Sequence, residues 1–383
     1  MKHKNLISQM IGSILIVLLL SACATSQPTS TPIPPTQTLI SPTSTSVPLT
    51  STPIPPTATL EPTTTPTEIA NQNPPPMCYA WMAYDKESDR TILFGGAIAN
   101  DANDVIGETW AYDGSANRWT LMNPASGPSA RGGVAMAYDS ESDRIILYGG
   151  VFNERTMNDT WAYDYNTNTW TAMAKGPISQ FGARMAYDAE SDRIVLFGGY
   201  SPLSGRFYNN TRVYDYNSDT WTDMKPSTSP PGRNYHSMAY DAESDRVIMW
   251  GKGEKSDDSV WAYDFDTNTW EEMKPGGGPA PLLRIYSAMV YDAALDRMIL
   301  FGGSPDGNEA WSYDYNTNTW TKLEPETVPY EATRHALVYN EAQDSVILFG
   351  GVNGAANTLY TGETWVYDPN ANAWTNMTTT VAK

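Results

Sequence analysis

Arginine and tyrosine side chains recur at one place in the repeated part of this sequence, just before a short apolar segment that ends in Tyr-Asp. Arg131, Arg233 and Arg284 each stand seven residues before that tyrosine. Tyr235 and Tyr286 follow their arginine by two residues. Guanidinium groups bind carboxylates through paired hydrogen bonds, and tyrosine rings stack on sugars or on other side chains. These residue types at this spacing therefore predict a site for an acidic ligand.

Two histidines occur in the same register. His236 follows Tyr235 directly, and His335 occupies the matching position in the last copy of the repeat. The sequence contains no phosphate-binding loop, no metalloprotease motif and no Ser-His-Asp order. The seven residues Arg131, Arg233, Tyr235, His236, Arg284, Tyr286 and His335 are therefore the candidate ligand-binding set, and no catalytic residue is assigned.

The elements that position these residues belong to a repeat. A segment such as Met82-Ala-Tyr-Asp, followed by the pair Gly95-Gly96, occurs six times, and the second residue of the pair falls at positions 96, 150, 199, 252, 303 and 351. The period of about 50 residues is typical of radially repeated β-sheets.

Each copy has the pattern of four strands. The apolar run ending in Tyr-Asp is followed by a β-branched run before Gly-Gly, then by segments such as 160–163 and 169–171. Turn residues separate them, and the Asp-x-Asn-x-Asn runs, such as 164–168, lack the Gly and Glu of a calcium loop. One such sheet cannot bury both faces, whereas six stacked radially can. We expect an all-β, six-bladed propeller of four-stranded antiparallel blades over residues 77–378.

The spacing of Gly-Gly, Tyr and Trp resembles the kelch family, as in Gly150, Tyr163 and Trp170. Two positions depart from the pattern. Lys252 replaces the second glycine in the fourth copy, and Arg212 stands where the other copies have Trp110, Trp161, Trp261, Trp311 and Trp365. We expect the second strand of the fourth copy to be distorted at Lys252, because glycine reaches backbone angles that other residues adopt only with strain.

The kelch resemblance implies a binding module for a protein or glycan, and it leaves two roles open for the candidate residues. Arg and His at these positions of kelch repeats also serve as structural hydrogen-bond donors. Galactose oxidase, a kelch-fold enzyme, holds copper with two tyrosines and two histidines, one tyrosine being crosslinked to a cysteine, and Tyr235, His236 and His335 are partly similar. Such ligands suit Cu(II). However, Cys78 lies in the first copy, and residues 132–134 offer no tyrosine.

We therefore expect no metal and no cofactor. Whether the chain is an enzyme stays open, with binding favoured; the alternative is a carbohydrate-active kelch-fold enzyme of the sugar oxidase or sialic acid mutarotase type.

The connections between second and third strands vary in sequence, and so do those between copies. The turns on the opposite face are monotonous and acidic. We expect Arg131, Arg233 and Arg284, at the start of the innermost strands, to ring the mouth of the central channel. Because varied loops on a repeated scaffold usually carry specificity, we place the functional face on the variable loops. They are residues 97–108, 151–159, 200–210, 252–259, 304–309 and 352–363.

The N-terminal residues predict export. Residues 1–22 have the basic head and apolar run of a signal peptide, and they end in Leu-Ser-Ala before Cys23, which resembles the lipobox of bacterial lipoproteins. Cys23 is the expected lipidation site. Residues 23–76 are rich in Thr, Pro and Ser and cannot form a packed core, so we expect a disordered tether. The predicted location is the bacterial cell surface or a periplasm-facing membrane, with membrane contact through the lipid only.

The charge balance excludes one class of partner. The formal net charge is -19, from 24 basic and 43 acidic residues. Such a chain is repelled by phosphate backbones, so nucleic acid is not an expected ligand. We expect a monomer that presents its loops to a protein or glycan of unknown identity.

Overall fold

The computed structural model describes residues 73–98, 104–254, 259–276, 278–305, 307–330, 332–353 and 359–378 of the 383-residue chain. The predicted signal peptide, Cys23 and nearly all of the tether lie outside these residues. Within them every regular element is a strand, which confirms the all-β class. The described residues include no helix with the length and apolar character needed to cross a membrane.

The described strands form six four-stranded sheets, numbered here in chain order. Sheet 1 contains β1 (Trp81–Asp85), β2 (Arg90–Phe94), β3 (Thr109–Asp113) and β4 (Arg118–Leu121). Sheet 2 contains β5 (Ala135–Asp139), β6 (Arg144–Tyr148), β9 (Thr160–Asp164) and β10 (Thr169–Met173). Sheet 3 contains β11 (Arg184–Asp188), β12 (Arg193–Phe197), β15 (Thr211–Asp215) and β16 (Thr220–Asp223).

The second half of the chain repeats this arrangement. Sheet 4 contains β17 (Ser237–Asp241), β18 (Arg246–Trp250), β19 (Val260–Asp264) and β20 (Thr269–Met273). Sheet 5 contains β21 (Ala288–Asp292), β22 (Arg297–Phe301), β23 (Ala310–Asp314) and β24 (Thr319–Leu323). Sheet 6 contains β26 (Ala336–Asn340), β27 (Ser345–Phe349), β30 (Thr364–Asp368) and β31 (Ala373–Asn376).

Each sheet is an antiparallel meander in which consecutive strands pair, as predicted. Short strands also occur on the variable face, in three loops between second and third strands and in the connection between sheets 5 and 6. They are β7 (Val151–Phe152) with β8 (Arg155–Thr156), β13 (Tyr200–Ser201) with β14 (Arg206–Phe207), and β28 (Val352–Asn353) with β25 (Ala332–Thr333) and β29 (Leu359–Tyr360). These short pairs extend the loops in which the sequence varies.

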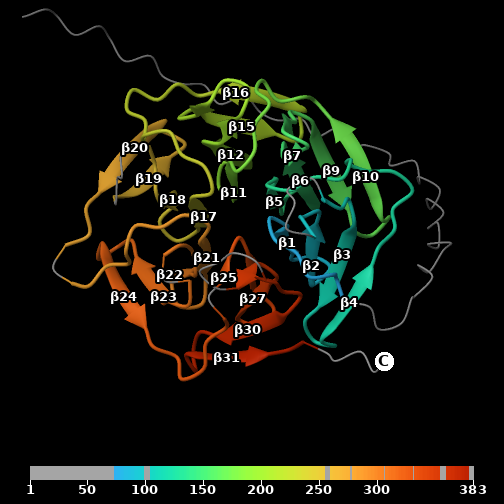
Figure 1. The fold of residues 1–383 in the computed structure, drawn as a ribbon. Coiled ribbons are helices and arrows are strands. Elements are labelled where there is room, and N and C mark those ends of the chain that lie inside the picture. Colours follow the sequence, from blue (N-terminus) through green and yellow to red (C-terminus); the bar gives the residue numbers. More distant parts are fainter. Residues whose placement is uncertain are drawn as a thin grey trace, which may run out of the picture. The chain divides into compact units, whose positions relative to one another are not determined.

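Neighbouring sheets meet through their first strands. β1 packs against β5, β5 against β11, β11 against β17, β17 against β21 and β21 against β26, and β26 contacts β1 again. Figure 1 shows these first strands nearest the centre and the fourth strands outermost. Each sheet is built from one continuous stretch of chain, so the first and last sheets meet directly rather than sharing strands. The sequence had left this closure open.

Apolar side chains fill the spaces between sheets. One cluster joins Tyr84 and Leu93 of sheet 1 to Ile347 and Phe349 of sheet 6. Five similar clusters lie between the other neighbouring sheets of the described chain. Both faces of each sheet are thereby removed from water, which supplies the main favourable free energy of folding.

Asp and Asn side chains form the turns at the opposite face from the variable loops. In sheet 2, Asp164 Oδ1 accepts a hydrogen bond from the backbone N–H of Thr167 at 3.1 Å, and the Tyr163 hydroxyl donates to Asn168 Oδ1 at 2.8 Å. Asn168 has a φ of 51°, a left-handed conformation that Asn tolerates. The interpretation of 164–168 as a self-capped turn is confirmed.

Lys252 changes the end of β18. In sheet 1, both Gly95 and Gly96 have positive φ, at 70° and 111°, whereas in the equivalent pair of sheet 4 Gly251 has positive φ and Lys252 does not. β18 pairs with β19 at three positions, while β2 pairs with β3 at four. The end of β18 is therefore distorted at Lys252, as predicted. The lysine does not adopt the positive φ of glycine, and the ladder with β19 is one pair shorter.

Candidate functional site

A closed ring of backbone hydrogen bonds surrounds the centre where the chain enters the first strands. Its six members, one from each repeat, are Tyr79, Gly133, Gly182, Tyr235, Tyr286 and Arg334, which we call the axial ring. Each backbone N–H donates to the carbonyl of the preceding member over 2.7 to 3.2 Å, and the N–H of Tyr79 donates to the carbonyl of Arg334. All six have φ between 51° and 69°. This ring fixes where the two predicted tyrosines lie.

The structure brings Tyr235 and Tyr286 together and adds Tyr79 to them. The ring centroids are 4.8 Å apart for Tyr235 and Tyr286, 5.2 Å for Tyr79 and Tyr235, and 6.0 Å for Tyr79 and Tyr286. The Arg334 guanidinium lies 4.4 Å from the centroid of Tyr286 and 5.3 Å from that of Tyr79. Such contacts are attractive because the cation faces the negative side of the ring.

A second cation completes this layer. The guanidinium of Arg184, at the start of β11, lies 3.9 Å from the ring centroid of Trp81 and 5.7 Å from that of Tyr235. Burial lowers the pKa of Arg184 to about 10, so the side chain stays charged at neutral pH. The cavity that remains among these side chains measures about 10 Å³, which is at most the space of one water molecule. Arginine and aromatic side chains therefore close the centre on this face.

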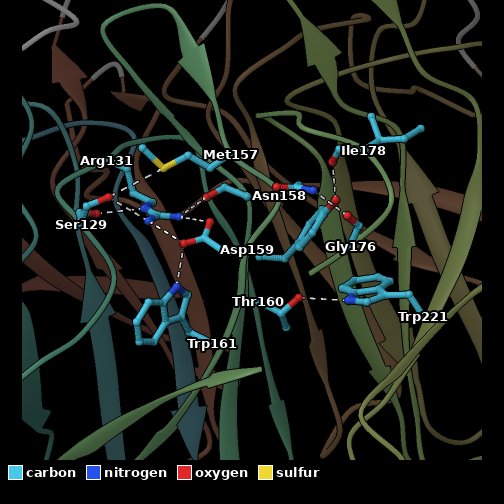
Figure 2. A network of polar contacts seen from close by, with 12 residues as sticks. Ser129, Arg131, Met157, Asn158, Asp159, Thr160, Trp161, Gly176, Ile178 and Trp221 are labelled. Atoms are coloured by element: carbon cyan, nitrogen blue, oxygen red, sulfur yellow. Dashed lines mark hydrogen bonds and ion pairs between the residues drawn. The ribbon is translucent and has the colours of Figure 1, made fainter. Parts of the chain in front are cut away.

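The three predicted arginines do not line that centre. Arg131 is buried, and Asp159 accepts two hydrogen bonds from its guanidinium, at 2.6 and 2.9 Å. The same guanidinium donates to the backbone carbonyls of Ser129 and Gly149. Figure 2 shows this network, in which Asp159 also accepts from the indole of Trp161. Arg131 thus ties the chain before β5 to the loop after β6.

Arg284 and Arg233 repeat this arrangement. Arg284 donates to Glu309 Oε2 at 2.8 Å and to the carbonyls of Leu282 and Gly302. Arg233 donates to the carbonyls of Pro231 and Gly251. The expectation that these guanidinium groups ring the channel mouth is wrong, because all three are buried beneath the loops. Each of the three arginines donates hydrogen bonds to the loops around it, which is a structural role. Binding of an acidic ligand by these arginines stays a prediction.

The carboxylate in the Arg284 network is strongly stabilised in its charged form. Burial raises the pKa of Glu309, but hydrogen bonds from Lys322, Arg284 and Trp311 outweigh burial and hold the pKa at about 2. The Lys322 amino group lies 2.6 Å from Glu309 Oε1, and the Trp311 indole donates to Oε2 at 3.1 Å. Glu309 is therefore already paired and leaves Arg284 little capacity for a second anion.

The two histidines pack in separate places. His236 lies edge-on to Phe197, and His335 lies edge-on to Phe301. Both are buried, and burial lowers the pKa of His335 to about 3 and that of His236 well below its usual value. Their imidazoles are neutral at physiological pH. Within the described residues, no three His, Cys, Asp or Glu side chains gather as metal ligands would.

A cavity along the axis of the first strands opens on the opposite face. Its volume is about 350 Å³, and it extends from Trp81 along the first strands to the turns that follow them. Rings of equivalent side chains line it, with methionine or leucine nearest Trp81, then alanine or valine, then tyrosine. The tyrosines are held in place at the turns, as where the Tyr84 hydroxyl donates to Asp89 Oδ1 at 3.0 Å. The cavity is thus apolar along the first strands and lined by tyrosines toward the turns.

Exposed apolar side chains mark the variable face. Among the described residues, six large hydrophobic side chains are exposed, and five of them belong to connections on that face. They are Ile98, Phe152, Leu203, Leu282 and Leu359. Leu203 is 88% exposed and Leu359 is 66% exposed. The sixth, Leu295, lies in the turn between β21 and β22 on the other face.

Sequence reasoning missed Tyr79, Arg184 and Arg334. Tyr79 and Arg334 were detectable, because each stands three residues before the apolar residue that matches Met82 in its own copy, as Tyr235 does before Met238. The arginine that precedes Tyr235 and Tyr286 by two residues is replaced by Met77 in the first copy, so the Arg-x-Tyr spacing does not mark Tyr79. Arg184 carried no periodic signal.

Comparison with protein families supports the repeat. A family model described as the KLHDC2/KLHL20/DRC7 Kelch-repeats domain matches residues 57–251 and again residues 183–383. Together the two matches cover well over half of the chain and all six sheets.

Proposed function

Because the chain belongs to the kelch-repeat family, we propose that it is a protein-interaction module whose six sheets are the blades of one closed β-propeller. The cyclic contacts of the first strands support the six-blade interpretation, and so does the closed axial ring. The family match supports a role in protein binding.

The partner is bound by the variable loops. The observation that carries this assignment is the concentration of exposed apolar side chains on one face, where Leu203 and Leu359 are the most exposed. Five exposed apolar side chains on this face, against one on the other, favour it as the protein-binding surface. The turns of the other face are acidic and built from nearly identical segments, so they offer little that is specific to one partner.

The module is displayed outside the cytoplasm as a monomer. This part of the proposal rests on the sequence, in which the lipobox at Cys23 and the Thr/Pro-rich residues 23–76 precede the propeller. An extended proline-rich chain advances about 3.1 Å per residue, so the tether would hold the loops on the order of 150 Å from the membrane. A partner on another cell or in the medium would be within reach.

The test compares matched surface variants of the full chain. Leu203→Ser and Leu359→Ser each remove one exposed apolar side chain from the variable face, and Leu295→Ser does the same on the opposite face. Immobilised protein is used to recover partners from extracts of extracellular and cell-surface proteins. Recovery should fall for the first two variants and stay at the wild-type level for Leu295→Ser. Equal recovery by all three variants would show that the variable loops do not bind.

A further inference from the structure

Two sheets share a network of three side chains on the variable face. In sheet 2, Asp159 lies between the guanidinium of Arg131 and the indole of Trp161, whose Nε1 donates to it at 2.7 Å. In sheet 5, Glu309 lies between Arg284 and Trp311 in the same way. Figure 2 shows the sheet 2 example. In both, one carboxylate neutralises a buried cation and accepts from a tryptophan.

Sheet 3 replaces all three members. Gln180 stands at the position of Arg131, Asn210 at that of Asp159, and Arg212 at that of Trp161. The structure confirms the first equivalence: a Cβ atom built on Gly199 would lie 3.1 Å from Gln180 Cδ, as one on Gly150 would lie 3.1 Å from Arg131 Cδ. Sheet 3 therefore keeps a cation in this region but lacks the carboxylate.

Arg212 and Gln180 are buried, and each has polar atoms that form no hydrogen bond with a described residue. Arg212 is 3% exposed and Gln180 is 1% exposed. Nε and Nη1 of Arg212 have no hydrogen-bond partner among the described residues, and neither do Nε2 and Oε1 of Gln180. Asp223 is the register partner of Arg212 between β15 and β16, but it is exposed and forms no ion pair with it in the described structure.

A buried guanidinium in this state needs a counter-charge. Arginine does not lose its proton in proteins, so it cannot become neutral as a buried lysine does. Burial of an ion without a partner costs several kcal/mol, and a water molecule satisfies hydrogen bonds without supplying charge. Burial lowers the pKa of Arg212 and outweighs the Asp223 carboxylate and the hydroxyls of Tyr148 and Tyr208, which favour the charged form of Arg212.

We propose that Arg212 and Gln180 bind a small monovalent anion, a halide or a carboxylate, where sheets 2 and 5 carry their own carboxylate. The guanidinium supplies the charge and the Gln180 amide N–H supplies a further donor. The site lies beside the loop of residues 200–210, which the proposed function assigns to partner binding, but it does not depend on that assignment.

The test gives sheet 3 its own carboxylate. Asn210→Asp places an acid at the position of Asp159, and Arg212→Trp restores the residue that the other five copies carry. Asn209→Asp is the matched control, since it adds the same charge at the exposed neighbouring position. Thermal unfolding of the full chain is followed in anion-poor buffer with added bromide, and separately with added acetate.

Wild type and Asn209→Asp should be stabilised saturably by bromide, acetate or both. At an anion concentration about 100 times the dissociation constant, the ratio of folded to unfolded protein should rise about 100-fold. Asn210→Asp and Arg212→Trp should lose the saturable part and keep only the general salt effect. The anion that saturates identifies the source as halide or carboxylate. Crystals grown with bromide should show anomalous signal beside Arg212.

Two results overturn the proposal. The first is an equal salt response in wild type and Asn210→Asp. The introduced carboxylate would then not have displaced a bound anion. The second is saturable stabilisation of Arg212→Trp, because the anion would then bind elsewhere. If Arg212→Trp does not fold, the comparison of Asn210→Asp with Asn209→Asp still decides.

Discussion

The tryptophans of the fourth strands give a direct measure of what one hydrogen bond contributes between sheets. In four places the indole Nε1 donates to a threonine hydroxyl of the preceding sheet, at 2.8 to 3.0 Å. One example is Trp170, which donates to Thr109. Trp374 of sheet 6 lies in the same kind of pocket, against Phe301, but Ala310 stands where the threonine would be. Its Nε1 is buried without a partner in the described structure.

Ala310→Thr should therefore stabilise the protein. A net gain of about 1 kcal/mol is typical when a buried donor acquires a neutral acceptor. The pocket should accept the larger side chain, because Ala310 pairs with Phe301 as Thr109 pairs with Phe94. For a domain of this size, the gain corresponds to a rise of about 2 °C in the unfolding midpoint.

Ala310→Val is the control that separates hydrogen bonding from packing, since valine has the shape of threonine without the hydroxyl. The difference in unfolding free energy between the Thr and Val variants should be about 1 kcal/mol in favour of Thr. The reverse change, Thr109→Val, should destabilise by about 1 to 3 kcal/mol, because it leaves the Trp170 indole without its acceptor. Chemical denaturation measures all three. If Ala310→Thr is no more stable than Ala310→Val, the missing acceptor for the Trp374 indole N–H does not destabilise the fold.

Four further predictions concern the axial ring, the histidines, the carboxylate network and the anchor. Gly133→Ala should cost about 1 to 2 kcal/mol in denaturation, because φ is 65° and the added methyl approaches the Tyr235 hydroxyl; an unchanged midpoint contradicts this. His236 and His335 should not titrate between pH 8 and 5 by NMR. Since the unfolded chain takes up these protons near pH 6.5, their contribution to stability should be lost as the pH falls from 6.5 toward 3. Glu309, with a pKa of about 2, should stabilise the fold above pH 4.5 and lose that contribution as the pH falls toward 2; Glu309→Gln should flatten this part of the pH profile. Cys23→Ser should move the protein from the detergent phase to the aqueous phase, and unchanged partition would argue against lipidation.

The repeat made the fold predictable from the sequence. The side-chain hydrogen-bond networks between distant parts of the chain could not be predicted in this way. Strand pairing and turn chemistry follow from residues close in sequence, such as Asp164 with Thr167. The arginines were misplaced because their partners are distant: Asp159 follows Arg131 by 28 residues. Spacing indicated that the arginines share one level of the ring, but it carried no information on whether they face solvent or the interior.

The axial ring shows why one side of the centre differs from the other. All six positions have left-handed backbone, which glycine adopts without strain, yet only Gly133 and Gly182 are glycines. A Cβ built on Gly133 would lie 3.1 Å from the Tyr235 hydroxyl, and one on Gly182 would lie 3.3 Å from the same ring. Tyr235 therefore occupies space that two missing side chains leave free. The exact repetition of the sheets is therefore broken at their centre, where glycine at two positions makes room for the Tyr235 side chain.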